Sequence, residues 1–149
     1  MKQPNEKVKI QPPLLAMIFI ALAFVLGLLQ PIPVTLPPAA RWVGFGLAAL
    51  GFLLGLAAWM AFRQARKKSA KSALVTSGVY RWSRNPIALG FVLMLIGLTL
   101  NVGSVWGLLL SPALIVSFNL LVIQPEEKIL TSRFGKEYEA YKTRVRRWL

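Results

Sequence analysis

Residues 74–90 read LVTSGVYRWSRNPIALG, a basic and aromatic segment that runs directly into an apolar one. A second polar segment reads PEEKIL from Pro125, and FGKEYEAY follows it from Phe134 to Tyr141. Each polar segment lies at one end of an apolar run whose length approaches the thickness of a bilayer. The two segments therefore predict one polar site at the surface of a membrane-embedded bundle of helices.

The composition is typical of a membrane protein. The chain has 149 residues, of which 56% are hydrophobic and 15% charged, whereas soluble domains carry about 25% charged residues. Arg41 is the one charged residue between Ile10 and Phe62. A net charge of +13 would also suit a nucleic-acid-binding protein, but these basic residues flank apolar runs, as headgroup contacts and topology signals do. We therefore expect the lipid bilayer as a partner and no nucleic acid.

Four apolar runs predict an all-α polytopic membrane protein with four transmembrane helices. We expect the spans at about 14–29, 42–62, 86–100 and 105–123, followed by a cytosolic amphipathic C-terminal helix over 125–148, all within one membrane-embedded domain, 1–149. An apolar stripe predicts that last helix, which Gly135 could divide: Leu130, Phe134, Tyr138, Tyr141, Val145 and Trp148. Small residues line one face of the second span and predict close helix packing there: Gly44, Ala48, Gly51, Gly55 and Ala58.

The distribution of basic residues predicts the orientation. Every Lys and Arg except Arg41 falls in the N-terminal arm, in the connector 63–85 or in the C-terminal tail. Four spans place these three regions on the same side of the membrane, and the positive-inside rule identifies that side as the cytoplasm. We therefore expect an integral membrane protein with both termini cytoplasmic.

The titratable side chains limit the chemistry. The chain has no Cys, no His and no Asp, so we expect no thiolate, imidazole or metal site. Its side-chain carboxylates are Glu6, Glu126, Glu127, Glu137 and Glu139. The pair after Pro125 has two interpretations: it makes a favourable helix start, and it is the acidic pair at the membrane boundary where a cation could bind.

The two polar segments resemble those of the isoprenylcysteine carboxyl methyltransferase and phospholipid methyltransferase family. The first family pattern, Gly-x-Tyr and then Arg-His-Pro-x-Tyr-x-Gly, is matched by Gly78, Tyr80, Arg84, Asn85, Pro86, Ala88 and Gly90. The second pattern, Glu-Glu-x-x-Leu and then Phe-Gly-x-x-Tyr-x-x-Tyr, is matched by Glu126, Glu127, Leu130, Phe134, Gly135, Tyr138 and Tyr141. The resemblance covers residues 74–149, and the last residues look like those of bacterial members.

This resemblance implies an S-adenosylmethionine-dependent methyltransferase of a bacterial inner membrane, acting on a lipophilic or membrane-associated carboxylate or amine. It implies Asn85, Arg84 and Glu126 as catalytic residues. It implies a cofactor site of Tyr80, Arg84, Asn85, Pro86, Leu89, Gly90, Glu126, Glu127, Tyr138 and Tyr141. Carboxylates and aromatic faces suit a sulfonium cation, and an acceptor that is already ionised needs no general base.

The chain departs from the family pattern at three places, which leave two alternatives open. Asn85 replaces the family His, Ala88 replaces a Tyr, and residues 120–124 lack the arginine that eukaryotic members place before the Glu pair. Membrane sterol reductases share a similar Arg-His-Pro-x-Tyr cluster, so one alternative is an NADPH-dependent membrane oxidoreductase. The other is a helical membrane protein without catalytic activity. Binding of S-adenosylmethionine, of NADPH or of neither would separate the three.

Overall fold

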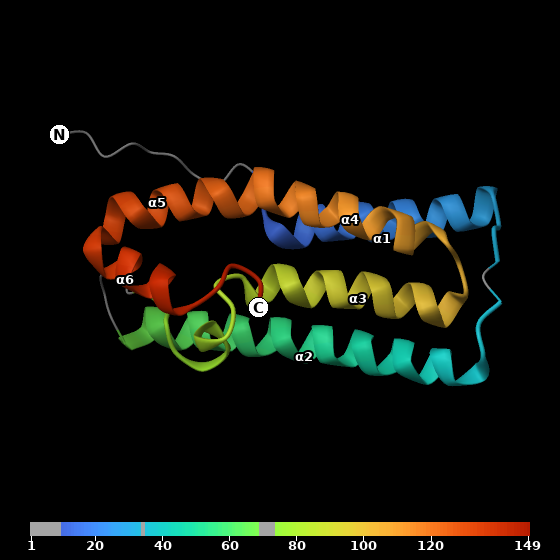
Figure 1. Cartoon of the computed structure of the whole chain (residues 1–149), viewed down its shortest axis with the longest axis horizontal. Coiled ribbons are helices and arrows are strands. Elements are labelled where there is room, and N and C mark those ends of the chain that lie inside the picture. The colour runs from blue at the N-terminus through green and yellow to red at the C-terminus, as the bar shows by residue number, and fades with distance from the viewer. Residues whose placement is uncertain (1–9, 34, 69–73) are drawn as a thin grey trace.

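The described part of the chain is almost entirely helical and contains no strand. The computed structural model describes residues 10–33, 35–68 and 74–149. Four apolar helices lie side by side along the molecule (Figure 1): α1 (Pro12–Leu29), α2 (Pro38–Lys68), α3 (Pro86–Val102) and α4 (Trp106–Phe118). The shorter elements are the 3-10 turn η1 (Gly78–Arg81), the π-helical segment η2 (Asn119–Ile123), α5 (Gln124–Phe134) and α6 (Lys136–Arg144). The predicted all-helical class is confirmed.

Within the described residues, three helices are long and apolar enough to cross a membrane, by length and composition. They are α1, the part Pro38–Ala65 of α2, and the continuous helix Trp106–Phe134 that α4, η2 and α5 form. α3 is apolar but has 17 residues, which is about 25 Å at 1.5 Å per residue and less than the roughly 30 Å of a hydrocarbon core. Three of the four predicted spans are therefore long and apolar enough to cross a membrane, and the span predicted at 86–100 stays a prediction.

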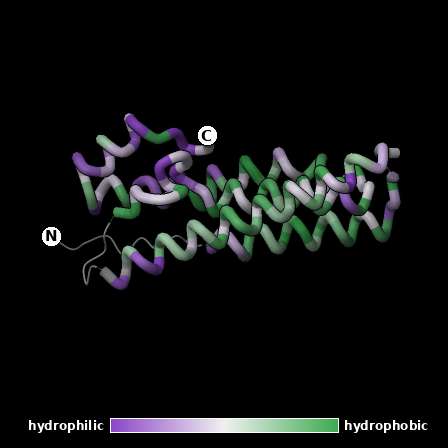
Figure 2. The backbone as a smooth tube through the Cα atoms, turned by 90° about the horizontal axis from the view of Figure 1, so that it is seen from below, coloured by the Kyte–Doolittle hydropathy of each residue, from purple (hydrophilic) through white to green (hydrophobic). Residues whose placement is uncertain are grey.

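Hydrophilic residues gather at one end of the molecule, and hydrophobic residues cover most of the remainder (Figure 2). Four of the eleven residues of α5 are charged, so the apolar part of the long helix ends near Gln124. We call η1, α5, α6, residues 82–85 and residues 145–149 the polar head. These elements lie beyond the end of the apolar part of the helix bundle.

The predicted face of small residues on α2 packs against α3. A Cβ atom added to Gly97 of α3 would lie 2.5 Å from the backbone N of Ala48 and 2.6 Å from the carbonyl O of Gly44. Farther along the same pair, a Cβ on Gly90 would lie 2.6 Å from the carbonyl O of Gly51. The two backbones are therefore in direct contact, as small residues permit between helices in lipid. This contact positions the start of α3, and with it the polar residues just before Pro86.

The predicted helix over 125–148 is wrong in its boundaries. The helix does not begin at Pro125, because η2 joins α4 to α5 without a break. The wider π-helical turn ends two residues before this proline, which has no N–H to donate. Gly135, at φ 51° and ψ −120°, separates α5 from α6, as the sequence suggested. The last helix ends at Arg144 because Val145 is extended, at φ −125° and ψ 130°. Residues 145–149 therefore turn away from α6 and run past the start of α3 (Figure 1).

Candidate functional site

The polar head encloses a cavity of about 80 Å³. Residues from α2, η1, α5, α6 and the segments before η1 and α3 line it: Phe62, Leu74, Val75, Tyr80, Arg84, Asn85, Glu126, Glu127, Leu130, Tyr138 and Tyr141. Seven of the ten residues predicted to bind a cofactor are in this set. The two polar segments of the sequence, far apart along the chain, therefore meet at one site.

Local backbone geometry brings these segments together. Gly78 has φ +63° and opens η1, and Pro86 occupies the first turn of α3, where the missing N–H costs nothing. On the other side, the turn at Gly135 folds α6 back, so that the Tyr141 hydroxyl donates a hydrogen bond of 2.6 Å to the carbonyl of Tyr80. This bond ties α6 to η1 across the cavity.

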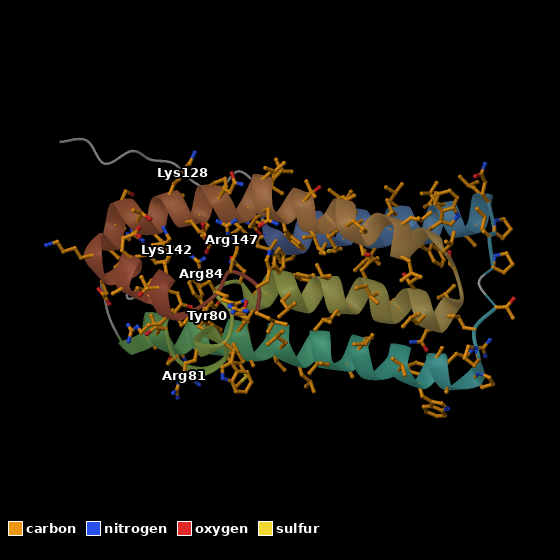
Figure 3. The ribbon with its side chains drawn as sticks, in the orientation of Figure 1. Tyr80, Arg81, Arg84, Lys128, Lys142 and Arg147 are labelled. Atoms are coloured by element: carbon orange, nitrogen blue, oxygen red, sulfur yellow. The ribbon has the colours of Figure 1, made fainter. Side chains whose placement is uncertain are left out.

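Glu127 is held by two guanidinium groups. Arg147 donates to it in a bidentate manner, with Nη2 2.7 Å from Oε2 and Nε 3.1 Å from Oε1, and Arg84 Nη1 lies 3.1 Å from Oε1. The Arg84 contact is an ion pair without hydrogen-bond alignment, because Nε and Nη1 of Arg84 are buried and have no hydrogen-bond partner in the described part. Figure 3 shows Arg84, Arg147 and Tyr80 together at the centre of the polar head, whereas Arg81 and Lys128 point outward on opposite sides. The charge of Glu127 is thus compensated by two guanidinium groups, while Arg84 Nε, which is not the ion-paired nitrogen, keeps a hydrogen-bond donor to offer.

Glu126 differs from its neighbour in having no ion pair among the described residues. It lines the cavity, and the residue is nevertheless exposed to solvent. Loss of hydration among the surrounding atoms, and then the like charge of Glu127, raise the pKa of the Glu126 carboxyl. A bound cation would favour the ionised form. Glu126 is therefore the cavity carboxylate whose charge no ion pair compensates among the described residues.

The tyrosines line the cavity as protonated phenols, which can donate hydrogen bonds but do not act as general bases at neutral pH. Burial, and then the charge of Glu126, raise the pKa of Tyr80 above its ordinary value, and burial raises the pKa of Tyr141 to about 12. Tyr138 is 1% exposed, and burial raises its pKa as well. All three phenols stay protonated at neutral pH, and the ring of Tyr138 already has a cation near it, with Lys142 Nζ 5.8 Å from the ring centre.

Asn85 and its neighbours hold the segment 145–149. Asn85 Nδ2 and the Ser83 hydroxyl donate to the carbonyl of Arg147 at 3.2 and 3.3 Å, and the Arg84 N–H donates to the carbonyl of Arg146 at 3.0 Å. The Ser83 hydroxyl oxygen also accepts from the N–H of Asn85 at 3.1 Å. Asn85 occupies the N-cap position of α3 without making a side-chain cap. With Nδ2 engaged, its Oδ1 is the group that remains for the cavity.

Three predicted cofactor residues do not line the cavity. Pro86 is buried at the start of α3, Leu89 lies in its first turn, and Gly90 packs against the backbone of α2. Four apolar residues that line the cavity were not among the predicted site residues: Phe62, Leu74, Val75 and Leu130. Ser83 and Arg147, which lie beside the cavity, were not predicted either. Leu130 belonged to the predicted apolar stripe, but nothing in the sequence distinguishes Arg147 from the basic residues around it.

Comparison with known proteins places this chain in a family. Residues 39–137, more than half of the chain, match the family model for phospholipid methyltransferases. The match runs from α2 to the beginning of α6 and includes η1 and the Glu pair.

Two curated relatives also match, both named protein-S-isoprenylcysteine O-methyltransferase. The protein from Saccharomyces cerevisiae is 40% identical over 86 residues, which cover 53% of this chain and 33% of the relative. The protein from Schizosaccharomyces pombe is 33% identical over 81 residues, which cover 54% of this chain and 34% of the relative. The chain thus spans about a third of the length of these relatives, and no solved structure gives a significant match. On the strength of the family match, this chain belongs to the phospholipid methyltransferase family.

Proposed function

We propose that this chain is a membrane-embedded, S-adenosylmethionine-dependent methyltransferase whose acceptor is a lipophilic or membrane-associated carboxylate or amine. Family membership and the names of the two yeast relatives support the reaction class. The observation that carries the proposal is the cavity itself, where the unpaired Glu126 carboxylate faces a set of protonated tyrosines. When bound, the cofactor supplies a methyl group on a positively charged sulfonium.

The chemistry of the cavity residues fits this cofactor, which carries a carboxylate as well as its cationic groups. Glu126 and the aromatic face of Tyr80 suit the cation. Arg84, whose Nε has no hydrogen-bond partner in the described part, suits the carboxylate. Pockets for ligands of this size have volumes of about 300 Å³ or more, so the cavity of about 80 Å³ must widen. The hydrogen bond between Tyr141 and Tyr80 is the contact that such an opening would release.

The residues of this site act by binding and orientation. The chain contains no His, Cys or Asp, and its cavity tyrosines stay protonated, so the acceptor arrives ionised or, as an amine, already nucleophilic. Holding two reactants in line supplies a large part of the rate of such a displacement. In this proposal Glu126 binds the cation, Arg84 binds the carboxylate and Asn85 offers Oδ1 to the cavity. Pro86, Leu89 and Gly90 then serve by fixing where α3 begins.

A ligand titration tests the proposal. Protein purified into nanodiscs is titrated with S-adenosylmethionine, with its demethylated product and with NADPH. We expect the first two to bind and NADPH not to bind. Binding of NADPH alone would replace the proposal by the reductase alternative, and binding of no ligand would replace it by the non-catalytic one. Radiolabelled methyl transfer to a prenylcysteine carboxylate and to an aminophospholipid then distinguishes the two acceptor classes.

We further propose that α3 is a fourth span of one domain covering residues 1–149, in a bacterial inner membrane. The polar head, with the connector 63–85 and both termini, would then lie in the cytoplasm. The support is the charge distribution, because Arg41 lies in the first turn of α2, at the opposite end of that helix from Arg63 and Lys67.

Cysteine labelling tests this orientation without background, because the chain has no cysteine. Single variants Arg41→Cys, Lys67→Cys and Lys128→Cys all place the thiol at an exposed position. With a membrane-impermeant maleimide added to intact cells, we expect labelling of Arg41→Cys alone, and of all three after permeabilisation. Labelling of Lys128→Cys in intact cells would contradict the orientation.

A further inference from the structure

Arg147 lies outside the cavity but contacts one of its carboxylates. Its side chain is 37% exposed and forms the bidentate pair with Glu127, whose side chain is 13% exposed. The backbone at Arg147 is held separately, because its carbonyl accepts the hydrogen bonds from Asn85 and Ser83. Val145 is buried beside the tyrosines, and Trp148 packs on the apolar core. The position of the segment therefore does not depend on the Arg147 guanidinium.

The charges around the Glu pair show what that guanidinium contributes. Two neighbouring carboxylates, Glu126 and Glu127, line the cavity with a single basic residue, Arg84. Without Arg147, Glu127 would have Arg84 as its one ion-pair partner among the described residues. The carboxylate, already 3.1 Å from Arg84 Nη1, could then turn further toward Arg84 and occupy Nε as well, the donor that a ligand would need.

We propose that Arg147 is a positioning residue, which holds and neutralises Glu127 from outside the cavity and so leaves Arg84 and Glu126 available to the ligand. The role rests on the proposed function, since it concerns the same cofactor site. It goes beyond that function because Arg147 does not line the cavity and would contact neither the cofactor nor the acceptor. Arg147 also lies beyond the part of the chain that matches the family model.

The proposal predicts a shift in the titration of Glu126 in the ligand-free protein. The described titratable and charged groups that face this carboxyl are Glu127, Arg84, Tyr80, Tyr138 and Tyr141, with Arg147 behind Glu127. Arg147→Gln keeps the backbone and removes the charge that offsets Glu127, and a less compensated like charge raises the pKa of a carboxyl. We expect the pKa of Glu126 to rise by about half a pH unit or more. Arg147→Lys should stay close to the parent, because it keeps the positive charge.

Carbon-13 NMR of glutamate-labelled protein in nanodiscs measures this shift directly. The chain has five side-chain carboxyl groups, all glutamate, and Glu126→Gln assigns the relevant resonance. Arg146→Gln is the matched control, since Arg146 is exposed and its backbone makes the same kind of contact. The double variant Glu127→Gln/Arg147→Gln removes the like charge together with its partner, so the pKa of Glu126 should return to or below the parent value. A merely structural role for Arg147 would leave the double variant as perturbed as the single one.

The outcomes separate this inference from the proposed function. If Arg147→Gln titrates like the parent, or if the double variant does not reverse the shift, Arg147 is not a positioning residue. If the parent protein fails to bind S-adenosylmethionine, the proposed function is wrong, yet the titration of the ligand-free protein still decides the role of Arg147. If Arg147→Gln alone does not fold, Arg147→Lys and the double variant provide the same comparison.

Discussion

Replacement of Glu126 by Gln is expected to weaken S-adenosylmethionine binding by about 5- to 150-fold, or about 1–3 kcal/mol. The variant keeps the size of the side chain and removes the carboxylate that has no ion pair in the described part of the polar head. A cationic ligand then loses a charged hydrogen-bond partner at a site that is partly shielded from water. Calorimetric titration of the folded variant in nanodiscs measures the change.

The matched control is Glu137→Gln, which makes the same chemical change at an exposed position of α6. Its affinity should equal that of the parent. In the parent protein, the affinity contributed by Glu126 should be fully present above the raised pKa of that carboxyl and should be lost as the pH falls through it. The Glu126→Gln variant should lack this dependence. Unchanged affinity in the folded variant would remove Glu126 from the cofactor site.

Replacement of Gly97 by Ala is expected to destabilise the protein by about 1–3 kcal/mol, the usual cost of overpacking a close contact. The new methyl group would lie 2.5 Å from the backbone N of Ala48 and 2.6 Å from the carbonyl O of Gly44. Both neighbours are backbone atoms of α2, so neither can move aside as a flexible side chain would, and the two helices must separate. The midpoint of thermal unfolding in one detergent should fall.

Gly46→Ala is the control for this prediction, because a Cβ at Gly46 meets no atom within 4 Å. Gly46 lies inside α2, the partner helix in this contact, and its replacement by Ala should stabilise the protein by about 0.4–1 kcal/mol. The two variants should therefore change the midpoint in opposite directions. A midpoint for Gly97→Ala at or above that of Gly46→Ala would show that α2 and α3 do not pack as closely as described.

The stability of the α2–α3 pair matters for the site as well as for the fold. Gly90 lies in the first turns of α3, and a Cβ there would approach the backbone at Gly51 and Gly55. The family resemblance implies that Gly90 belongs to the cofactor site, which stays a prediction; the structure shows that Gly90 also lies in this helix contact. A glycine at this position fixes the distance between α2 and the start of α3, and so the position of Arg84 and Asn85.

Patterns that repeat along a single helix could be predicted from the sequence alone. Hydrophobic length marks α1, α2 and the helix from Trp106 as apolar, and the spacing of small residues identifies the face of α2 that packs on α3. The two polar segments could also be assigned to one end of the bundle, since the first leads into an apolar run at Pro86 and the second follows one at Pro125. These features depend on local sequence, so they are visible without a fold.

The different ion-pair partners of Glu126 and Glu127 were decided by the tertiary structure. The two residues are adjacent and identical in type, and only the return of residues 145–149 past the start of α3 brings Arg147 to Glu127 and leaves Glu126 unpaired. That return depends on the turn at Gly135, which the sequence suggested, and on the extended backbone of Val145, where the sequence pattern predicted helix. Ion pairs between distant segments are set by the path of the chain in space, which the periodicity of a sequence does not encode.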